Sequence, residues 1–265
     1  MSHSPKPGTA STSHEAISGP EYLFRGFKLL REPSIRPFAI IPLIINVVVI
    51  VALFVSGAMG MSALLDSWMA GLPAWLDWLK TLLWLVLAIG LLLLLCFSFT
   101  LLANLIAAPF NGWLSARVEA HLTGVEPYSG LTMTQEAWQS IRGELGKLWF
   151  LATRAALLGI VSLILFWIPV VNAILPVLWF LFGAYMLALE YMDHPMANHG
   201  LEFKAKRQLL AEHRGLSLSF GGAATLLTAI PLVNLIIMPA AVAGATQAWV
   251  ERLRPVPATS PTANQ

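Results

Sequence analysis

The amino-acid sequence predicts an all-α integral membrane protein, because of its composition and the spacing of its charges. Of the 265 residues, 57% are hydrophobic and 11% are charged, whereas about a quarter of the residues in soluble domains carry a charge. The charges leave four uncharged windows, residues 37–65, 81–116, 155–189 and 215–250. A helix needs about 20 apolar residues to cross a bilayer, so each window can hold one spanning helix.

The two ends of the chain differ from the rest. Residues 1–19 are polar and small, and residues 254–265 are rich in Pro, Thr and Ser, so we expect two disordered cytoplasmic tails. Residues 20–253 are then a single membrane domain. With Cys96 as the lone cysteine, no intramolecular disulfide is expected, and a net charge of +2 gives no reason to expect a nucleic-acid partner.

The first two windows each predict a full transmembrane helix. Window 37–65 has Pro37 and Pro42 near its start, where a helix tolerates proline, and then continues as Val, Ile and Leu. Window 81–116 begins among Trp residues that suit a membrane interface, and Pro109 with the following Asn-Gly predicts its end.

The last two windows contain the same interruption, "IPVVN" at 168–172 and "IPLVN" at 230–234. Proline breaks a helix and asparagine favours a turn. The apolar arms have about 11 to 16 residues, and segments of roughly 10 to 14 are too short to span and are typical of re-entrant elements. We therefore predict two helical hairpins that enter the membrane and leave on the same side. Their tips would contain Pro169, Asn172, Pro231 and Asn234. The alternatives are pairs of short spans, giving six transmembrane helices, or one long kinked helix in each window.

The distribution of Lys and Arg predicts the orientation. Fifteen of the sixteen lie before residue 37 or after residue 116, and Lys80 alone lies in the loop 66–80. Because cytoplasmic loops retain these residues, the loop 66–80 should be periplasmic. Both termini and the segments 117–154 and 190–214 should be cytoplasmic.

A candidate anion site precedes the first span. Residues 20–31 predict a short amphipathic helix, Pro33 ends it, and the next helix would start at Ser34, Ile35 and Arg36. Backbone N–H groups and the positive dipole end favour an anion there, and a guanidinium adds a planar fork for oxyanions. The alternative is an interfacial helix whose cations only touch anionic lipid head groups.

Charges that border the apolar windows are candidates for an ion path, because ionisable groups at membrane depth tend to face a bundle interior. Arg154 and Glu190 flank the third window, and Arg117 and Glu119 follow the second. For Arg154 the alternative is snorkelling to the cytoplasmic interface.

Motifs for enzyme chemistry are scarce, and the sequence predicts neither catalysis nor a cofactor. The nearest approach to a metal site is Asp193, His194 and His199, but the two histidines straddle Pro195 and do not share a helix face. A turn at the cytoplasmic surface explains these residues more simply.

Four stretches carry a resemblance to a known family: "REPSIRPFAIIPLIIN", "IAAPFNGWLSARVEAHLTG", "PVLWFLFGAYMLALEYMDHPMANH" and "IPLVNLIIMPAAVAGATQAWV". With them the sequence resembles the CysZ sulfate permease family of bacterial inner membranes, over residues 22–252. The resemblance implies sulfate uptake for assimilation into cysteine. It also implies two long transmembrane helices, two hemi-penetrating hairpins, cytoplasmic helices and a homo-oligomer. A membrane scaffold or regulatory protein of sulfur assimilation, with no transport of its own, is the alternative.

The resemblance also implies a sulfate site. Family members bind sulfate at a Gly-Leu-Arg-type motif ahead of the first span, which matches Ser34, Ile35 and Arg36. Here Ser34 replaces the glycine, and Pro37 stands where a second arginine is common. Either the site binds sulfate more weakly than in other members, or Arg31 or Lys28 compensates for the missing charge.

Overall fold

The computed structural model describes residues 18–69, 73, 75 and 77–254, and every regular element in those ranges is a helix. This confirms the all-α prediction. The predicted disordered tails fall almost entirely in residues 1–17 and 255–265, outside the described residues. The side chains of Pro231 and Asn234, predicted at the second hairpin tip, also lie outside the described part.

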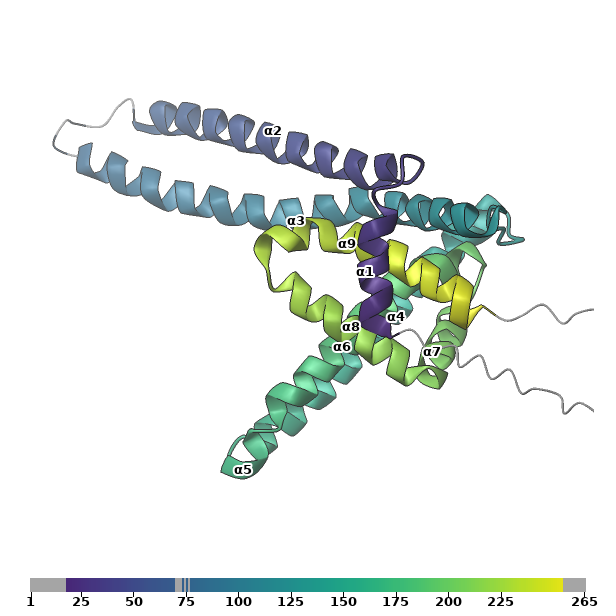
Figure 1. The fold of residues 1–265 in the computed structure, drawn as a ribbon. Helices are drawn as coiled ribbons and strands as arrows, with labels where there is room; N and C mark the ends of the chain where they lie inside the picture. Colours follow the sequence, from purple (N-terminus) through teal and green to yellow (C-terminus); the bar gives the residue numbers. More distant parts are fainter. Residues whose placement is uncertain (1–17, 70–72, 74, 76, 255–265) are drawn as a thin grey trace, which may run out of the picture.

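Two long helices, α2 (Arg36–Met69) and α3 (Asp77–Thr123), lie side by side and project from the rest of the molecule (Figure 1). At 1.5 Å per residue, the 34 residues of α2 extend about 50 Å, well beyond the hydrocarbon thickness of a bilayer. In the most apolar stretch of the segment Arg36–Leu64, only 6% of the residues are buried inside the protein. Such a bare apolar surface needs lipid or another subunit to cover it.

The helix α3 continues through Pro109, so the prediction that the second span ends there was wrong. It runs on to Thr123 because the segment after the proline packs into the core, where Leu114 and Val118 are fully buried. The amide of Asn198 also donates to the carbonyl oxygen of Gly112, at 3.1 Å. These contacts offset the roughly 3 kcal/mol that a proline inside a helix costs.

The helices α4 (Met133–Leu165), α5 (Pro169–Asn172) and α6 (Leu175–Asn198) form a hairpin with α5 at its tip (Figure 1). The indole N–H of Trp179 on α6 donates to the hydroxyl of Ser162 on α4, at 3.1 Å, so the two arms are joined near the tip. The chain therefore reverses direction at the first "IPVVN", which excludes one long kinked helix in this window.

The second "IPLVN" reverses the chain in the same way, between α8 (Arg214–Thr228) and α9 (Pro231–Ala248). In both copies the isoleucine is extended, with φ −104° and ψ 103° at Ile168 and φ −94° and ψ 111° at Ile230. A residue before proline is pushed out of the helical region, and proline is well suited to the first position of the next helix. Each copy of the repeat thus ends one helix and starts the next.

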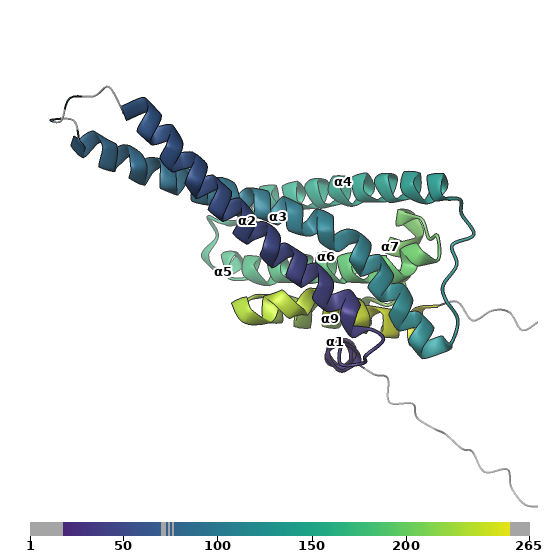
Figure 2. The same ribbon diagram turned by 90° about the horizontal axis from the view of Figure 1, so that it is seen from above.

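Within the described residues, three segments are long and apolar enough to cross a membrane by length and composition: Arg36–Leu64, Thr134–Leu165 and Pro169–Asn198. Two of these are the arms of the first hairpin, so the expectation that its arms are too short to span was wrong. At the base of the hairpin, both helices extend beyond the uncharged window 155–189, and these additional residues make both arms longer than expected. The first hairpin projects in a different direction from α2 and α3, whereas the turn between α8 and α9 lies much nearer the core than their far ends (Figures 1 and 2).

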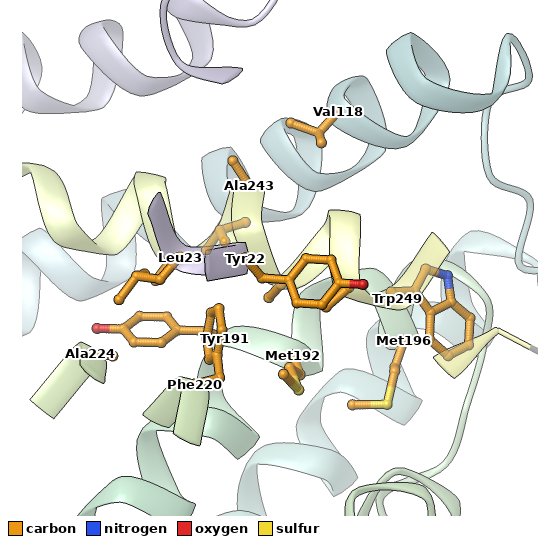
Figure 3. Close-up of a cluster of buried hydrophobic side chains, with 14 of the residues drawn as sticks. Tyr22, Leu23, Val118, Tyr191, Met192, Met196, Phe220, Ala224, Ala243 and Trp249 are labelled. Atoms are coloured by element: carbon orange, nitrogen blue, oxygen red, sulfur yellow. The ribbon is translucent and has the colours of Figure 1, made fainter. Parts of the chain in front are cut away.

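The core lies where α1 (Gly19–Leu29), α6, α8, α9 and the end of α3 meet, next to the π-helical turn η2 (Trp249–Leu253) and the short helix α7 (Phe203–Glu212). Figure 3 shows buried side chains of these elements facing one another, among them Tyr22, Met192 and Phe220. The apolar face of α1 is therefore covered by protein, since Tyr22 and Leu23 are fully buried.

The helices α1 and α9 touch backbone to backbone. A Cβ added to Gly26 would lie 2.0 Å from the carbonyl oxygen of Ala240, and one added to Gly244 would lie 2.3 Å from that of Tyr22. Small residues that let helix backbones meet are typical of packing in membrane proteins. The hydroxyl of Tyr22 donates to Glu251 at 3.0 Å, and burial together with this bond raises the pKa of Tyr22 to about 12.

Candidate functional site

The candidate anion site lies in the turn between α1 and α2. Arg31 and Arg36 both line a hollow of about 410 Å³, together with Pro33, Pro37 and Ile40. Among the described residues, no carboxylate lies within 4 Å of either guanidinium group. The structure therefore brings two of the predicted site residues to one open, positively charged hollow.

The backbone of the turn differs from the expectation. The N–H groups of Ile35 and Arg36 both donate to the carbonyl oxygen of Glu32, at 3.0 and 2.9 Å, so the prediction that they are free for an anion was wrong. The side chain of Ile35 is fully buried and fixes the turn to the core. Because Pro37 has no N–H, the donors that line this hollow are the two guanidinium groups, and Ser34 is exposed in the same turn but lies outside the lining.

Lys28 lies on α1, outside the lining of the hollow. Its neighbour Arg25 is held elsewhere, with Nη2 at 2.8 Å from Glu21 and Nη1 at 3.9 Å from Glu251. Lys28 therefore adds to the positive field of this region without contacting the hollow.

Glu119 is a buried carboxylate, with a side chain only 1% exposed. Its Oε1 lies 2.8 Å from Nε2 of His199 and 3.4 Å from Nη1 of Arg254, so it joins α3 to the end of α6 and to the end of η2. The ring of His199 also packs against Trp249, with ring centroids 5.3 Å apart. His199, considered above as a metal ligand, is thus the partner of a carboxylate.

Glu190 belongs to a second network, centred on Lys147 at the base of the first hairpin. The Nζ atom of Lys147 lies 3.0 Å from Glu190, 2.8 Å from Glu144 and 3.5 Å from Asp193. Asp193 also accepts from Lys206 of α7 at 2.7 Å. Both lysines are almost fully buried, so the network fastens α4, α6 and α7 together.

Neither of these two lysines stands out in the sequence. Glu144 and Lys147 are three residues apart on one helix, a spacing at which side chains meet, and that was the one local sign of the network. The approach of Lys206 to Asp193 joins two different helices, and nothing in the local sequence indicates it.

Arg117 and Arg154 lie apart from these networks. Arg117 is exposed and pairs with Glu126 at 3.8 Å. Arg154 is exposed on α4, where its guanidinium lies 5.6 Å from the ring centroid of Phe150. The four residues expected to border an ion path therefore do not gather at one place.

Two arginines on one open hollow can hold a small tetrahedral dianion, because each guanidinium presents parallel N–H donors to a pair of oxygen atoms. The exposed position limits the desolvation cost, so binding there is reversible. Glu119 and Glu190 are each paired with cations, which reduces their repulsion of an anion.

Comparison with known proteins shows the family of this chain. Residues 22–239 match the family model described as sulfate transporter CysZ/etoposide-induced protein 2.4. The chain is 40% identical over 263 residues to the sulfate transporter CysZ of Pectobacterium atrosepticum, covering 97% of this chain and 93% of the relative. It is 42% identical over 237 residues to that of Salmonella typhimurium, covering 88% and 92%. The chain therefore belongs to the CysZ/etoposide-induced protein 2.4 family.

Proposed function

We propose that this protein is a sulfate permease of the bacterial inner membrane, which supplies sulfate for assimilation into cysteine. The observation that carries the proposal is the pair Arg31 and Arg36 on one hollow beside the first membrane helix. The relatives named sulfate transporter CysZ support the choice of sulfate among tetrahedral anions.

Sulfate binds in this hollow between the two guanidinium groups, and the exposed hydroxyl of Ser34, in the same turn but outside the lining, donates to it at the rim. Arg31 takes the place of the second arginine that Pro37 displaces. Ile35 acts indirectly, because its buried side chain holds the turn in place, and Lys28 attracts the anion without touching it.

The membrane arrangement we propose keeps α2 and α3 as full spans and the two hairpins as re-entrant elements in a single membrane domain, with both termini cytoplasmic. The support is that the chain reverses at both copies of "IPxVN" and that the turn between α8 and α9 lies much nearer the core than the far ends of α2 and α3 (Figures 1 and 2). None of the residues in the most apolar stretch of α4 is buried inside the protein. This exposed apolar surface supports assembly as a homo-oligomer. Of the residues expected along the ion path, Glu119 and Glu190 act indirectly, because their ionic networks hold the helices in place, and the exposed Arg117 adds positive charge on the cytoplasmic side.

Uptake of radiolabelled sulfate into liposomes that contain the purified protein tests the function. Arg36→Gln should raise the half-saturating sulfate concentration about tenfold or more, since a charge-assisted hydrogen bond contributes about 1.5 to 3 kcal/mol. Lys204→Gln, which removes an exposed charge from α7, is the matched control and should transport normally. No flux above that of empty liposomes would exclude a permease and leave the scaffold role. Normal flux in an Arg31→Gln and Arg36→Gln double variant would place the site elsewhere.

Single cysteines test the membrane arrangement. Asn172→Cys and Asn234→Cys, each in a Cys96→Ser background, should resist a membrane-impermeant thiol reagent added from the periplasmic side. Labelling of either position from that side would indicate six full spans.

A further inference from the structure

A second cationic hollow lies between α4 and α7, away from the site above. Its volume is about 620 Å³, and Arg154 and Arg207 line it together with Trp149, Phe150 and Phe203. The guanidinium carbon of Arg207 lies 4.1 Å from the ring centroid of Phe150, and that of Arg154 lies 5.6 Å from it. One aromatic ring therefore holds two positive charges next to each other, in spite of their repulsion.

These two cations lack an anionic partner in the part of the chain that the structure describes. No carboxylate there lies within 4 Å of Arg154 or Arg207, and the buried Nε atom of Arg207 makes no hydrogen bond. A buried donor without an acceptor is costly, so native structures usually satisfy it. The two arginines that line the hollow therefore have no carboxylate partner among the described residues, and the hollow has room for an anion from outside the chain.

The hollow continues into an apolar groove. A second cavity of about 360 Å³ shares Phe150, Arg154 and Leu157 with the first, and Val161 and Leu178 extend it between α4 and α6. A ligand that fills both parts has an anionic head and an apolar chain. A free inorganic anion would leave the apolar half of the groove exposed to water.

The position along α4 fits a lipid. Arg154 is the last charged residue before the uncharged window 155–189. From Arg154 to the end of the helix at Leu165 the rise is about 16 Å, roughly half the hydrocarbon thickness of a bilayer. Trp149, one turn earlier, is 74% exposed, as expected for a tryptophan at the level of the lipid head groups.

We infer that this groove binds one anionic phospholipid, with its phosphate between Arg154 and Arg207 and an acyl chain along Leu157, Val161 and Leu178. The phosphate accepts from the terminal N–H groups of both guanidinium groups and neutralises their charges. The lipid joins the hairpin to α7, and Arg154 belongs to this site and not to the sulfate path. The inference does not depend on sulfate transport.

Native mass spectrometry of the purified, delipidated full chain tests the site. The protein is mixed with equal amounts of phosphatidylglycerol and phosphatidylcholine that carry the same acyl chains, and the retained lipid is measured. The wild type should retain phosphatidylglycerol preferentially. Arg154→Gln should weaken this retention about fivefold, and a double variant with Arg207→Gln about 25-fold, since each basic residue contributes about fivefold to binding of an anionic surface.

Controls separate charge, apolar fit and folding. Arg214→Gln removes an exposed arginine from the start of α8 and should retain lipid as the wild type does. Arg154→Lys keeps the charge and should retain most of the binding. Val161→Trp fills the apolar groove and should weaken retention with both arginines present. Far-ultraviolet circular dichroism confirms that each variant is folded.

Three results would overturn the inference. The first is equal retention of the two lipids by the wild type, and the second is equal retention by Arg154→Gln and Arg214→Gln. The third is complete displacement of phosphatidylglycerol by millimolar glycerol phosphate or sulfate, which would assign the hollow to a soluble anion.

Discussion

Gly26→Ala should destabilise the protein by forcing α1 away from α9. The added Cβ would lie 2.0 Å from the carbonyl oxygen of Ala240 and 2.7 Å from the backbone nitrogen of Gly244, whereas ordinary contacts begin at 3.4 Å. The two helices must therefore separate by about 1.4 Å, which forfeits about half of the dispersion energy of the contacts around it. Overpacking of this kind costs about 1 to 3 kcal/mol, and the better helix propensity of alanine offsets up to about 1 kcal/mol.

The assay is thermal unfolding of the purified protein in detergent, followed by circular dichroism. A net loss of about 1 to 2 kcal/mol corresponds to a fall in Tm of about 2 to 8 °C for a domain of this size. Gly90→Ala is the matched control, because no atom of the described residues lies within 4 Å of its added Cβ, and its Tm should stay or rise slightly. An equal Tm for the two variants would refute the reasoning about close helix packing. Because α1 leads directly into the turn that holds Arg31, sulfate uptake by Gly26→Ala should fall as well.

Three further changes test the buried polar contacts. Glu119→Gln keeps the shape of the side chain but removes the charge that faces Arg254, so Tm measurements should show a loss of about 1 to 3 kcal/mol, and an unchanged Tm would contradict the importance of this contact. Lys147→Met removes the lysine that contacts Glu190 and Asp193 and should cost about 1.5 kcal/mol in the same assay, because Glu190 is partly solvated and Asp193 keeps Lys206, whereas a gain in stability would mean that apolar packing outweighs the network. Tyr22→Phe concerns pH: the raised pKa contributes stability below about pH 10 that is lost as pH rises toward about 12, so the variant should be less sensitive to pH over this window, and a parallel decline of both proteins would count against it.

Local sequence signals predicted a large part of the fold. Each "IPxVN" ends one helix and starts another because proline restricts the residue before it and itself, and this effect needs no distant partner. The uncharged windows located the long helices for a similar reason, since the hydrocarbon of a membrane excludes charge whatever the tertiary structure. The same local reasoning placed Arg36 at the start of a membrane helix, where the structure has it.

Contacts between distant residues decided the rest. Pro109 was expected to end a helix, yet the burial of Leu114 and Val118 carries α3 past it. The backbone donors of Ile35 and Arg36 were expected to be free, yet the turn uses both for the carbonyl of Glu32.

The contacts between distant polar side chains show most clearly what the sequence could not predict. Glu119 meets His199 across 80 residues, and Tyr22 meets Glu251 across 229 residues. Composition and proline positions act through the backbone and the solvent that surrounds it, so the sequence alone determined a helical membrane protein with two proline-marked reversals. Which charge meets which, and which arginines share a hollow, depends on helix packing that brings together side chains with no local relation, and only the tertiary structure decides it.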